Sequence, residues 1–328
     1  MHRVFKSGKL HYGTAAAVLL PALLACIGAS SRAAAATPTY TTNLFAQPWE
    51  SGISGNFFVP PATNSPVPKG KFGLVLWQPD RFTSDGLLVP VGWGAGSKSG
   101  FTPSNPLIAQ LGFQSKSGTS TAQMEGNEVG AYINSQDLPP STTDQKMMIT
   151  PEFTFALGSQ PMPFASANTA LHGSMDLQVP TAVGSAAYVV LDMVFQTTSG
   201  VKISYGVAIF HNGAAPSAVT TGYDSPSNEY MLNSPLGVDQ RFVARASDSA
   251  GPTGTPWSGW RHFDWSISEA QFANALKYLT STYPGKVTSA DPTQYMLTNV
   301  HLNAEFHTKG KPAQLGWSMR GLTLWTTQ

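Results

Sequence analysis

Cysteine is almost absent from this sequence of 328 residues, which holds a single copy, Cys26. A lone cysteine near the N-terminus excludes an internal disulfide framework, a cysteine metal site and a catalytic thiolate in the body of the chain. Charged residues are also scarce, at 11% of the sequence, where an average soluble protein has roughly a quarter. The formal net charge of +1 gives no electrostatic basis for binding nucleic acid or an anionic membrane. We expect no nucleic-acid partner and no cofactor.

The N-terminal segment has the pattern of an export signal. A basic stretch without acidic residues, 1–13, is followed by an apolar run over 14–29 and a small-residue segment over 30–36. The apolar run contains Pro21 and is shorter than the roughly 20 residues of a membrane span. We therefore expect a signal peptide over 1–36, a secreted or periplasmic bacterial protein, and no integral membrane segment in the mature chain.

Cys26 leaves a second interpretation of this segment open. The run Leu23-Leu24-Ala25-Cys26 resembles a bacterial lipoprotein box, in which the cysteine is acylated and becomes the mature N-terminus. Simple cleavage near Ala36 would instead remove Cys26 with the signal. The alternatives are a freely secreted protein and a lipoprotein anchored at Cys26.

Glycine, proline and aromatic residues are abundant, with 31 Gly, 25 Pro, 17 Phe and 8 Trp. This composition is typical of many short strands joined by turns. The strands expected on this basis cover 72–77, 147–155, 174–179, 188–196, 201–211, 295–308 and 315–325, and residues 217–259 are expected to be turn-rich. One helix is expected from Ser268 to about Ser281. We predict an all-β, two-sheet concanavalin-like jelly-roll sandwich over 37–328, with one helix near the C-terminus.

The predicted strand over 300–307 has two chemically different faces, because alternate side chains of a strand point to opposite sides. The even-numbered residues are apolar and suit a core, whereas the odd-numbered ones are all polar: His301, Asn303, Glu305 and His307. Such a face suits a wet cleft lined by sugar, and an ordinary solvated face is the alternative. Since a straight strand would hold His301 and His307 roughly 20 Å apart, they cannot share one metal ion, and we expect no metal site.

Three other predicted strands combine an apolar face with a face that bears one carboxylate. Asp192 lies on the less apolar face of 188–196, Glu152 lies opposite Phe153 and its apolar neighbours, and Asp176 alternates with Met175 and Leu177. Strands of this kind pack as a sandwich whose outer sheet presents polar groups. A carboxylate partly buried by apolar neighbours, as Asp192 would be, tends toward a raised pKa.

Tryptophans cluster in the segment that leads to the helix. Trp257 and Trp260 lie within Pro256–His262, which we expect to be a loop, and Trp265 follows closely. Exposed indole rings suit the C–H faces of sugars. The alternative is that these rings fill the core beneath a long loop, as buried aromatic residues usually do.

The order of elements from Phe263 onward resembles the C-terminal end of the family-12 glycoside hydrolases, which are small jelly-roll endoglucanases. The run 272–279 corresponds to the family's helix, 289–297 to its Ser/Asp-rich turn and Tyr-Leu strand, and 303–306 to its Glu-Phe segment. The resemblance implies that Glu305 is the acid/base residue. The segment closest to the family's Glu-x-Met-Ile-Trp-like strand begins at Asp192, with Asp in place of the nucleophilic Glu. Matching Met193 to the family's Met instead puts Leu191 at that position.

Three functions remain open at this stage. The first is hydrolysis of a β-glucan-like polysaccharide, with Glu305 as acid/base and Asp192, or Glu152 as a substitute, as nucleophile about 5–5.5 Å away. The second is a non-catalytic glycan-binding protein on the same scaffold, and the third is a structural surface protein. The residues expected to bind the glycan are Trp257, Trp260, Asn303, His301, His307 and Glu152.

Overall fold

The computed structural model describes residues 119–327, except 126–127, 139, 156, 185 and 226, together with the strand segments 40–43, 70–77, 89–90 and 110–114. These residues all belong to one compact unit, Pro38–Gln328. The predicted signal peptide and Cys26 lie outside the described residues, so cleavage and lipid attachment stay predictions. No helix within the described residues is long and apolar enough to cross a membrane.

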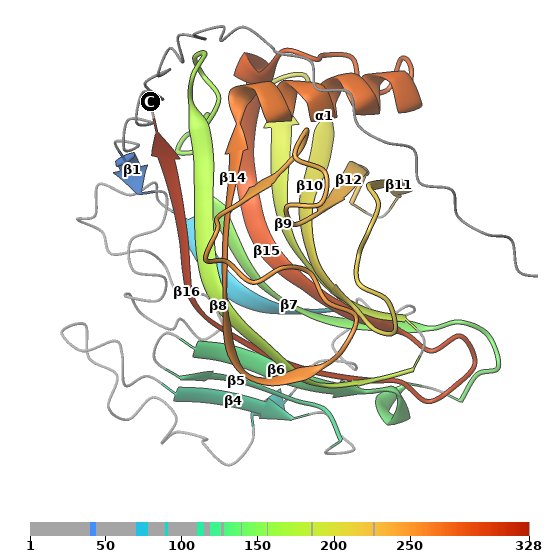
Figure 1. Ribbon diagram of the computed structural model, residues 1–328. Helices are drawn as coiled ribbons and strands as arrows, with labels where there is room; N and C mark the ends of the chain where they lie inside the picture. The colour runs from blue at the N-terminus through green and yellow to red at the C-terminus, as the bar shows by residue number, and fades with distance from the viewer. Residues whose placement is uncertain are drawn as a thin grey trace, which may run out of the picture. The chain divides into compact units, whose positions relative to one another are not determined.

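The described strands form two sheets (Figure 1). The nine-stranded sheet contains, in spatial order, β13 (Ala244–Arg245), β14 (Trp257–Ser268), β8 (Ala170–Val183), β16 (Gln314–Thr327), β6 (Glu128–Asn134), β5 (Thr121–Glu125), β4 (Gln110–Gln114) and β3 (Val89–Pro90), with β1 (Tyr40–Asn43) paired to β16. The seven-stranded sheet contains β11 (Thr220–Asp224), β12 (Glu229–Pro235), β10 (Lys202–His211), β9 (Ala186–Thr197), β15 (Tyr295–His307), β7 (Lys146–Phe155) and β2 (Gly70–Trp77). The predicted all-β sandwich is therefore confirmed.

The core forms where the apolar faces of the two sheets meet. On β15 the even-numbered residues predicted to face inward are buried, among them Leu302, Ala304 and Phe306. From the nine-stranded sheet, Trp265 and Trp317 are also buried almost completely. At ~25 cal/mol per Å² of apolar surface, burial of such large side chains is the main stabilising contribution to the sandwich.

One α-helix closes an end of this core. α1 (Glu269–Thr282) begins after Ser268, whose hydroxyl accepts a hydrogen bond from the Gln271 backbone N–H while the Gln271 side chain returns one to Ser268 N–H. This capping box satisfies two backbone donors that would otherwise lack partners. Phe272 faces the sandwich and stacks on Phe164 at 4.4 Å between ring centroids. The helix predicted from the sequence is confirmed to within one residue at each end.

Two regions differ from the sequence-based expectation. Residues 217–259, predicted as turns, contain β11, β12, β13 and the start of β14. The predicted tryptophan loop is the first part of β14, which pairs with β8 and is irregular between Trp257 and Arg261. β12 pairs in parallel with β10, which is not its neighbour in the chain. These segments become strands through long-range pairing, which local residue patterns do not reveal.

Candidate functional site

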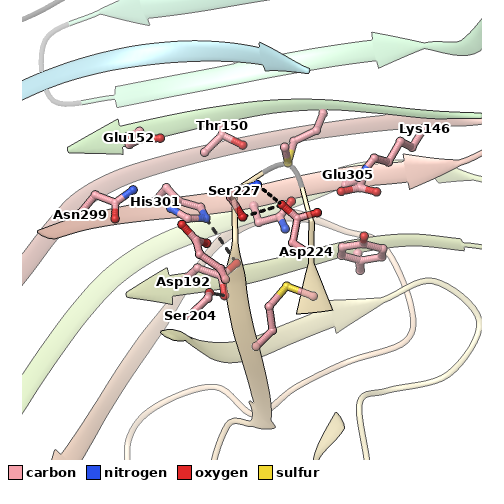
Figure 2. Close-up of a pocket in the computed structure, with 15 residues that line it drawn as sticks. Lys146, Thr150, Glu152, Asp192, Ser204, Asp224, Ser227, Asn299, His301 and Glu305 are labelled. Atoms are coloured by element: carbon pink, nitrogen blue, oxygen red, sulfur yellow. Dashed lines mark hydrogen bonds and ion pairs between the residues drawn. The ribbon is translucent and has the colours of Figure 1, made fainter. Parts of the chain in front are cut away.

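A cleft of about 180 Å³ lies on the outer face of the seven-stranded sheet (Figure 2). Six strands contribute to it, with β7 and β15 supplying alternate side chains as their pleat requires. The described lining residues are Lys146, Met148, Thr150, Glu152, Tyr188, Asp192, Ser204, Asp224, Ser227, Glu229, Met231, Asn299, His301, Asn303 and Glu305. The polar face predicted on 300–307 is therefore part of a real concavity.

Strand register sets the order of the polar groups along the cleft. His301 on β15 lies opposite both Asp192 on β9 and Glu152 on β7. Four residues further along β15, Glu305 lies opposite Tyr188 on β9. The cleft thus has one end built around Asp192 and another built around Glu305 (Figure 2).

Asp192 is almost completely buried, with 6% of its surface exposed. Ser204 Oγ donates a hydrogen bond to Asp192 Oδ1 at 3.0 Å, and His301 Nε2 lies 3.6 Å from Oδ2. Burial raises the pKa of Asp192, although His301, Ser204 and Asn303 act in the opposite direction, and the charge of Glu305 raises it further. The Asp192 carboxyl group is therefore suited to hold a proton and release it.

The floor of the Asp192 end depends on a glycine. A Cβ atom at Gly206 on β10 would lie 2.0 Å from Asn233 Oδ1 and 2.7 Å from Asp192 Oδ1. Real contacts of this kind do not occur, so the absent side chain is what lets the Asp192 and Asn233 side chains converge over β10. A glycine in a strand interior often marks such a close approach of other groups to the backbone.

Glu305, at 3% exposure, occupies a different environment. His307 Nε2 lies 2.7 Å from Glu305 Oε1, and His307 Nδ1 lies 2.8 Å from Asp144 Oδ2. Because both ring nitrogens face carboxylates, the imidazolium form satisfies both contacts. Contact with Glu305, and then with Asp144, raises the pKa of His307 despite partial burial. Glu305 Oε1 is therefore held directly beside the His307 ring.

Tyr188 and Asp144 complete this end of the site. The Tyr188 hydroxyl lies 3.4 Å from His307 Nε2, and burial followed by the Glu305 charge raises the pKa of Tyr188 far above its ordinary value. Tyr188 therefore stays neutral. Asp144 is fixed by the Lys309 backbone N–H, which donates to Oδ1 at 2.8 Å. Although burial raises the pKa of Asp144, this bond and the contact with His307 lower it overall.

Several buried polar atoms in the cleft have no hydrogen-bond partner within the described protein. Besides Glu305 Oε1, whose contact is the ion pair with His307, they are Thr150 Oγ1, His301 Nδ1 and Asn303 Oδ1. A buried polar atom without a partner costs about 1–3 kcal/mol, so such atoms are usually satisfied by water or by a ligand. The cleft is thus prepared for a molecule rich in hydroxyl or other hydrogen-bonding groups.

The structure brings together five of the residues predicted for the site: Glu152, Asp192, His301, Asn303 and Glu305 all line the cleft. His307, also predicted, contacts Glu305 beside the lining. The lining residues that the prediction missed include Tyr188 and Ser204, and also Asp224 and Glu229. Tyr188 alternates with Asp192 on one strand face and could have been found from that pattern. Asp224 and Glu229 lie on strands that the sequence pattern did not predict.

The two tryptophans predicted to bind sugar lie on the nine-stranded sheet, away from this cleft. Trp257 is 6% exposed, packs on Phe210 and Phe263, and donates from Nε1 to the Leu177 carbonyl at 3.2 Å. Its ring is therefore part of the core, as the alternative interpretation had it. Trp260 is partly exposed, and the Arg320 guanidinium covers its ring at 4.3 Å from the centroid.

No group of three or more metal-ligating side chains occurs within the part of the chain that the structure describes. His301 and His307 point to separate carboxylates, Asp192 for the first and Asp144 with Glu305 for the second. Both histidines are therefore placed to tune carboxyl groups.

Comparison with known proteins gives similarity in structure alone. No family model and no curated protein sequence matches the chain. Among solved structures, a family 12 glycoside hydrolase is similar at 12% identity and a TM-score of 0.35, covering 67% of this chain and 93% of that one. The family 11 xylanase from Neocallimastix patriciarum is similar at 13% identity and a TM-score of 0.31, over 66% of this chain and 91% of that one.

Endoglucanase 3 from Trichoderma harzianum, of family 12, is similar at 10% identity and a TM-score of 0.29, over 89% of this chain and 96% of that one. The family predicted from the C-terminal sequence is thus among the similar solved structures. Because the identities and TM-scores are low, the evidence for the two-sheet sandwich is the strand pairing of this chain itself. The evidence for its chemistry is likewise its own side chains. In fold, the chain is similar to the jelly-roll glycoside hydrolases of families 12 and 11.

Proposed function

We propose that this protein cleaves glycosidic bonds in a polysaccharide outside the cytoplasm, with Asp192 and Glu305 as the reacting carboxyl groups. The observation that carries the proposal is the pair itself. Two buried carboxyl groups share one polar cleft on neighbouring strands, Asp192 with a pKa raised by burial and Glu305 in contact with His307. Two carboxyl groups with unlike protonation are what hydrolysis of an acetal by general acid and base requires.

The environments favour the reverse of the roles assigned from the sequence. Asp192, whose pKa is raised by burial, is the better proton donor. Glu305, beside the His307 imidazolium, is the better base. Asp192 would give its proton to the leaving oxygen as the C–O bond breaks. Glu305 would take a proton from the water that attacks the anomeric carbon, so that one water is consumed per bond.

The register favours attack by water over a covalent intermediate. Glu305 lies four residues along β15 from His301, the partner of Asp192. At ~3.3 Å per residue, the two backbones are offset by roughly 13 Å. Inverting enzymes separate their carboxyl groups by about 6.5–9.5 Å to admit water, and retaining enzymes by about 5–5.5 Å. The residues directly opposite Glu305 are Tyr188 on β9 and Met148 on β7, and neither is a carboxylate.

His307 and Asp144 would act as positioning residues for the base. His307 fixes the Glu305 carboxylate through Nε2, and Asp144 fixes the ring through Nδ1. Replacing His307 by Gln should lower kcat roughly tenfold with little change in KM, because the base loses its neighbouring charge while the cleft keeps its shape.

The experiment is release of reducing ends from a panel of polysaccharides by the wild type, Asp192→Asn and Glu305→Gln. Asp176→Asn, a carboxylate on the nine-stranded sheet, is the matched control. We expect release by the wild type and the control, and a loss of about 100-fold or more in both cleft variants. Proton NMR of the first product anomer tests inversion. Release that survives in both cleft variants would refute the proposed pair.

A second candidate is a non-catalytic glycan-binding protein that uses the same cleft. The unpartnered Thr150, His301 and Asn303 atoms favour it, because they offer hydrogen bonds to a saccharide without requiring bond cleavage. Binding of oligosaccharides measured by calorimetry, with intact oligosaccharide recovered after long incubation, would select this function over hydrolysis.

A further inference from the structure

The cleft concentrates negative charge in a protein that is otherwise nearly neutral. The whole chain has 18 acidic residues and a formal net charge of +1. Five of those acidic residues line this cleft, and Lys146 is the one lysine or arginine among the described lining residues. The five are Glu152, Asp192, Asp224, Glu229 and Glu305. A cleft lined by one sign of charge raises the local concentration of ligands of the opposite sign.

Hydrolysis by general acid and base accounts for only two of the five. Glu152 and Asp224 accept hydrogen bonds from neutral groups, Thr154 Oγ1 at 2.8 Å and Ser227 Oγ at 2.6 Å, which leave their charges in place. His307 adds no net positive charge at the Glu305 end, because Asp144 matches it on the other side of the ring. Three carboxylates are therefore surplus to the proposed reaction.

Glu229 shows that these charges crowd one another. Burial raises its pKa, and the charges of Asp192 and Asp224 raise it further, against the opposing effects of His301 and Lys202. Lys202 lies opposite Glu229 in the pairing of β10 with β12 and does not line the cleft. A cation bound in the cleft would relieve this repulsion.

A second, independent feature indicates that the cleft is built for a ligand. The Thr150 side chain is 2% exposed, lines the cleft, and its Oγ1 has no partner within the described protein. Asn303 Oδ1, on the neighbouring strand, is likewise buried and unpartnered. A hydroxyl group, which can donate and accept, and an amide oxygen, which accepts, suit a ligand that carries hydroxyl or ammonium donors. No group of three or more side chains placed to hold a metal ion occurs among the residues that the structure describes.

We infer that the cleft takes a cationic glycan, a polymer of amino sugars whose amines are free and protonated, in preference to neutral or acidic polysaccharides. This inference rests on the proposed function of the same cleft. The ammonium groups would lie among the surplus carboxylates Glu152, Asp224 and Glu229, and the ring hydroxyls would satisfy Thr150 and Asn303. Carboxylates close to an amine also favour its protonated form, so binding and protonation would support each other.

The experiment measures calorimetric affinity for three oligosaccharides of equal length and β-1,4 linkage at mildly acidic pH. They are the glucosamine oligomer, its fully N-acetylated form, and the glucose oligomer. An oligomer of uronic acid is the fourth probe. We expect the glucosamine oligomer to bind at least roughly tenfold more tightly than the two neutral ones, with the difference shrinking as salt is added. The uronic acid oligomer should bind weakest.

Variants that each remove one negative charge test whether the cleft carboxylates produce the preference. Glu229→Gln and Glu152→Gln should each reduce the preference for the glucosamine oligomer over the glucose oligomer roughly three- to tenfold. Asp248→Asn removes one exposed charge outside the cleft and should change neither. Equal affinity for charged and neutral oligomers, or a preference that survives both glutamine variants, would overturn the cationic inference and leave hydrolysis standing. Failure of every glycan to bind or to be cleaved would overturn the proposed function itself.

Discussion

On the outer face of the nine-stranded sheet, Asp176 lies between His262 and Arg320, with His262 Nδ1 at 3.0 Å from Oδ1 and Arg320 Nε at 3.1 Å from Oδ2. On the outer face of the seven-stranded sheet, Asp192 is buried beside one histidine at 3.6 Å and shares its cleft with four other carboxylates. Both aspartates come from strands that have one apolar face and one face bearing a single carboxylate. The Asp176 carboxylate pairs with Arg320 at the surface, as in an ordinary structural ion pair. The ionised form of Asp192 is instead disfavoured by burial and by the charge of Glu305.

This contrast indicates on which of the two sheets reactive groups should be sought. A surface ion pair stabilises a protein by about 0–1 kcal/mol and performs no reaction. A desolvated carboxyl group costs stability and persists where function requires it. The proposed reacting groups therefore lie on the seven-stranded sheet, and the nine-stranded sheet packs against its inner face.

Among the substitutions that test this contrast, Asp192→Asn should have the largest effect on glycan cleavage. It should reduce glycan cleavage by about 100-fold or more, because the proton donor is lost. Its thermal stability at neutral pH should equal or exceed that of the wild type. The pKa of Asp192 is raised on folding, so the ionised group destabilises the fold at any pH above that pKa. Calorimetric Tm and initial rates measure both effects, and a large fall in Tm would contradict the account.

A pair of glycine substitutions compares the two sheets sterically. Gly206→Ala on β10 should lower the free energy of unfolding by about 1–3 kcal/mol, because its Cβ would press on Asn233 Oδ1 and Asp192 Oδ1. Gly316→Ala on β16 should change it by less than about 1 kcal/mol, since its closest contact would be Tyr132 Cδ2 at 3.3 Å. Urea denaturation of both variants gives the comparison, and equal effects would argue against a closely packed cleft floor.

The pH dependence of stability should separate the two ends of the cleft. The pKa of His307 is raised above its ordinary 6.5, so its contribution is complete below that value and is lost as pH rises through the higher, folded pKa. The ionised Asp192 carboxylate destabilises the folded protein, so its protonation restores stability as pH falls through its raised pKa. Unfolding free energies measured from acidic to mildly alkaline pH should fall at alkaline pH in the wild type. The fall should be smaller in His307→Gln.

The smallest effect is expected on the nine-stranded sheet. Asp176→Asn should change the free energy of unfolding by no more than about 1 kcal/mol, because its partners His262 and Arg320 are half-exposed and screened by solvent. Glycan cleavage should stay at the wild-type rate. A strong loss of cleavage in this variant would mean that the two faces are not functionally distinct.

The sequence by itself determined the sandwich, the helix α1 and the polar face of β15. Alternation with period two is a local property, so Leu302 and Phe306 could be assigned to the core and His301 and Glu305 to the opposite face before any partner strand was known. The helix was equally local, because Ser268 and Gln271 form its capping box within four residues.

Only the tertiary structure decided which polar faces share a cleft. Glu152, Asp176 and Asp192 follow the same local pattern, and strand pairing sends Asp176 to one sheet and the other two to the cleft. The tryptophan segment needed the pairing of β14 with β8 to become a strand, which buried Trp257. Pairing and burial depend on residues distant in sequence, and they also set the protonation of Asp192 and His307, because desolvation and neighbouring charge exist only in the folded chain.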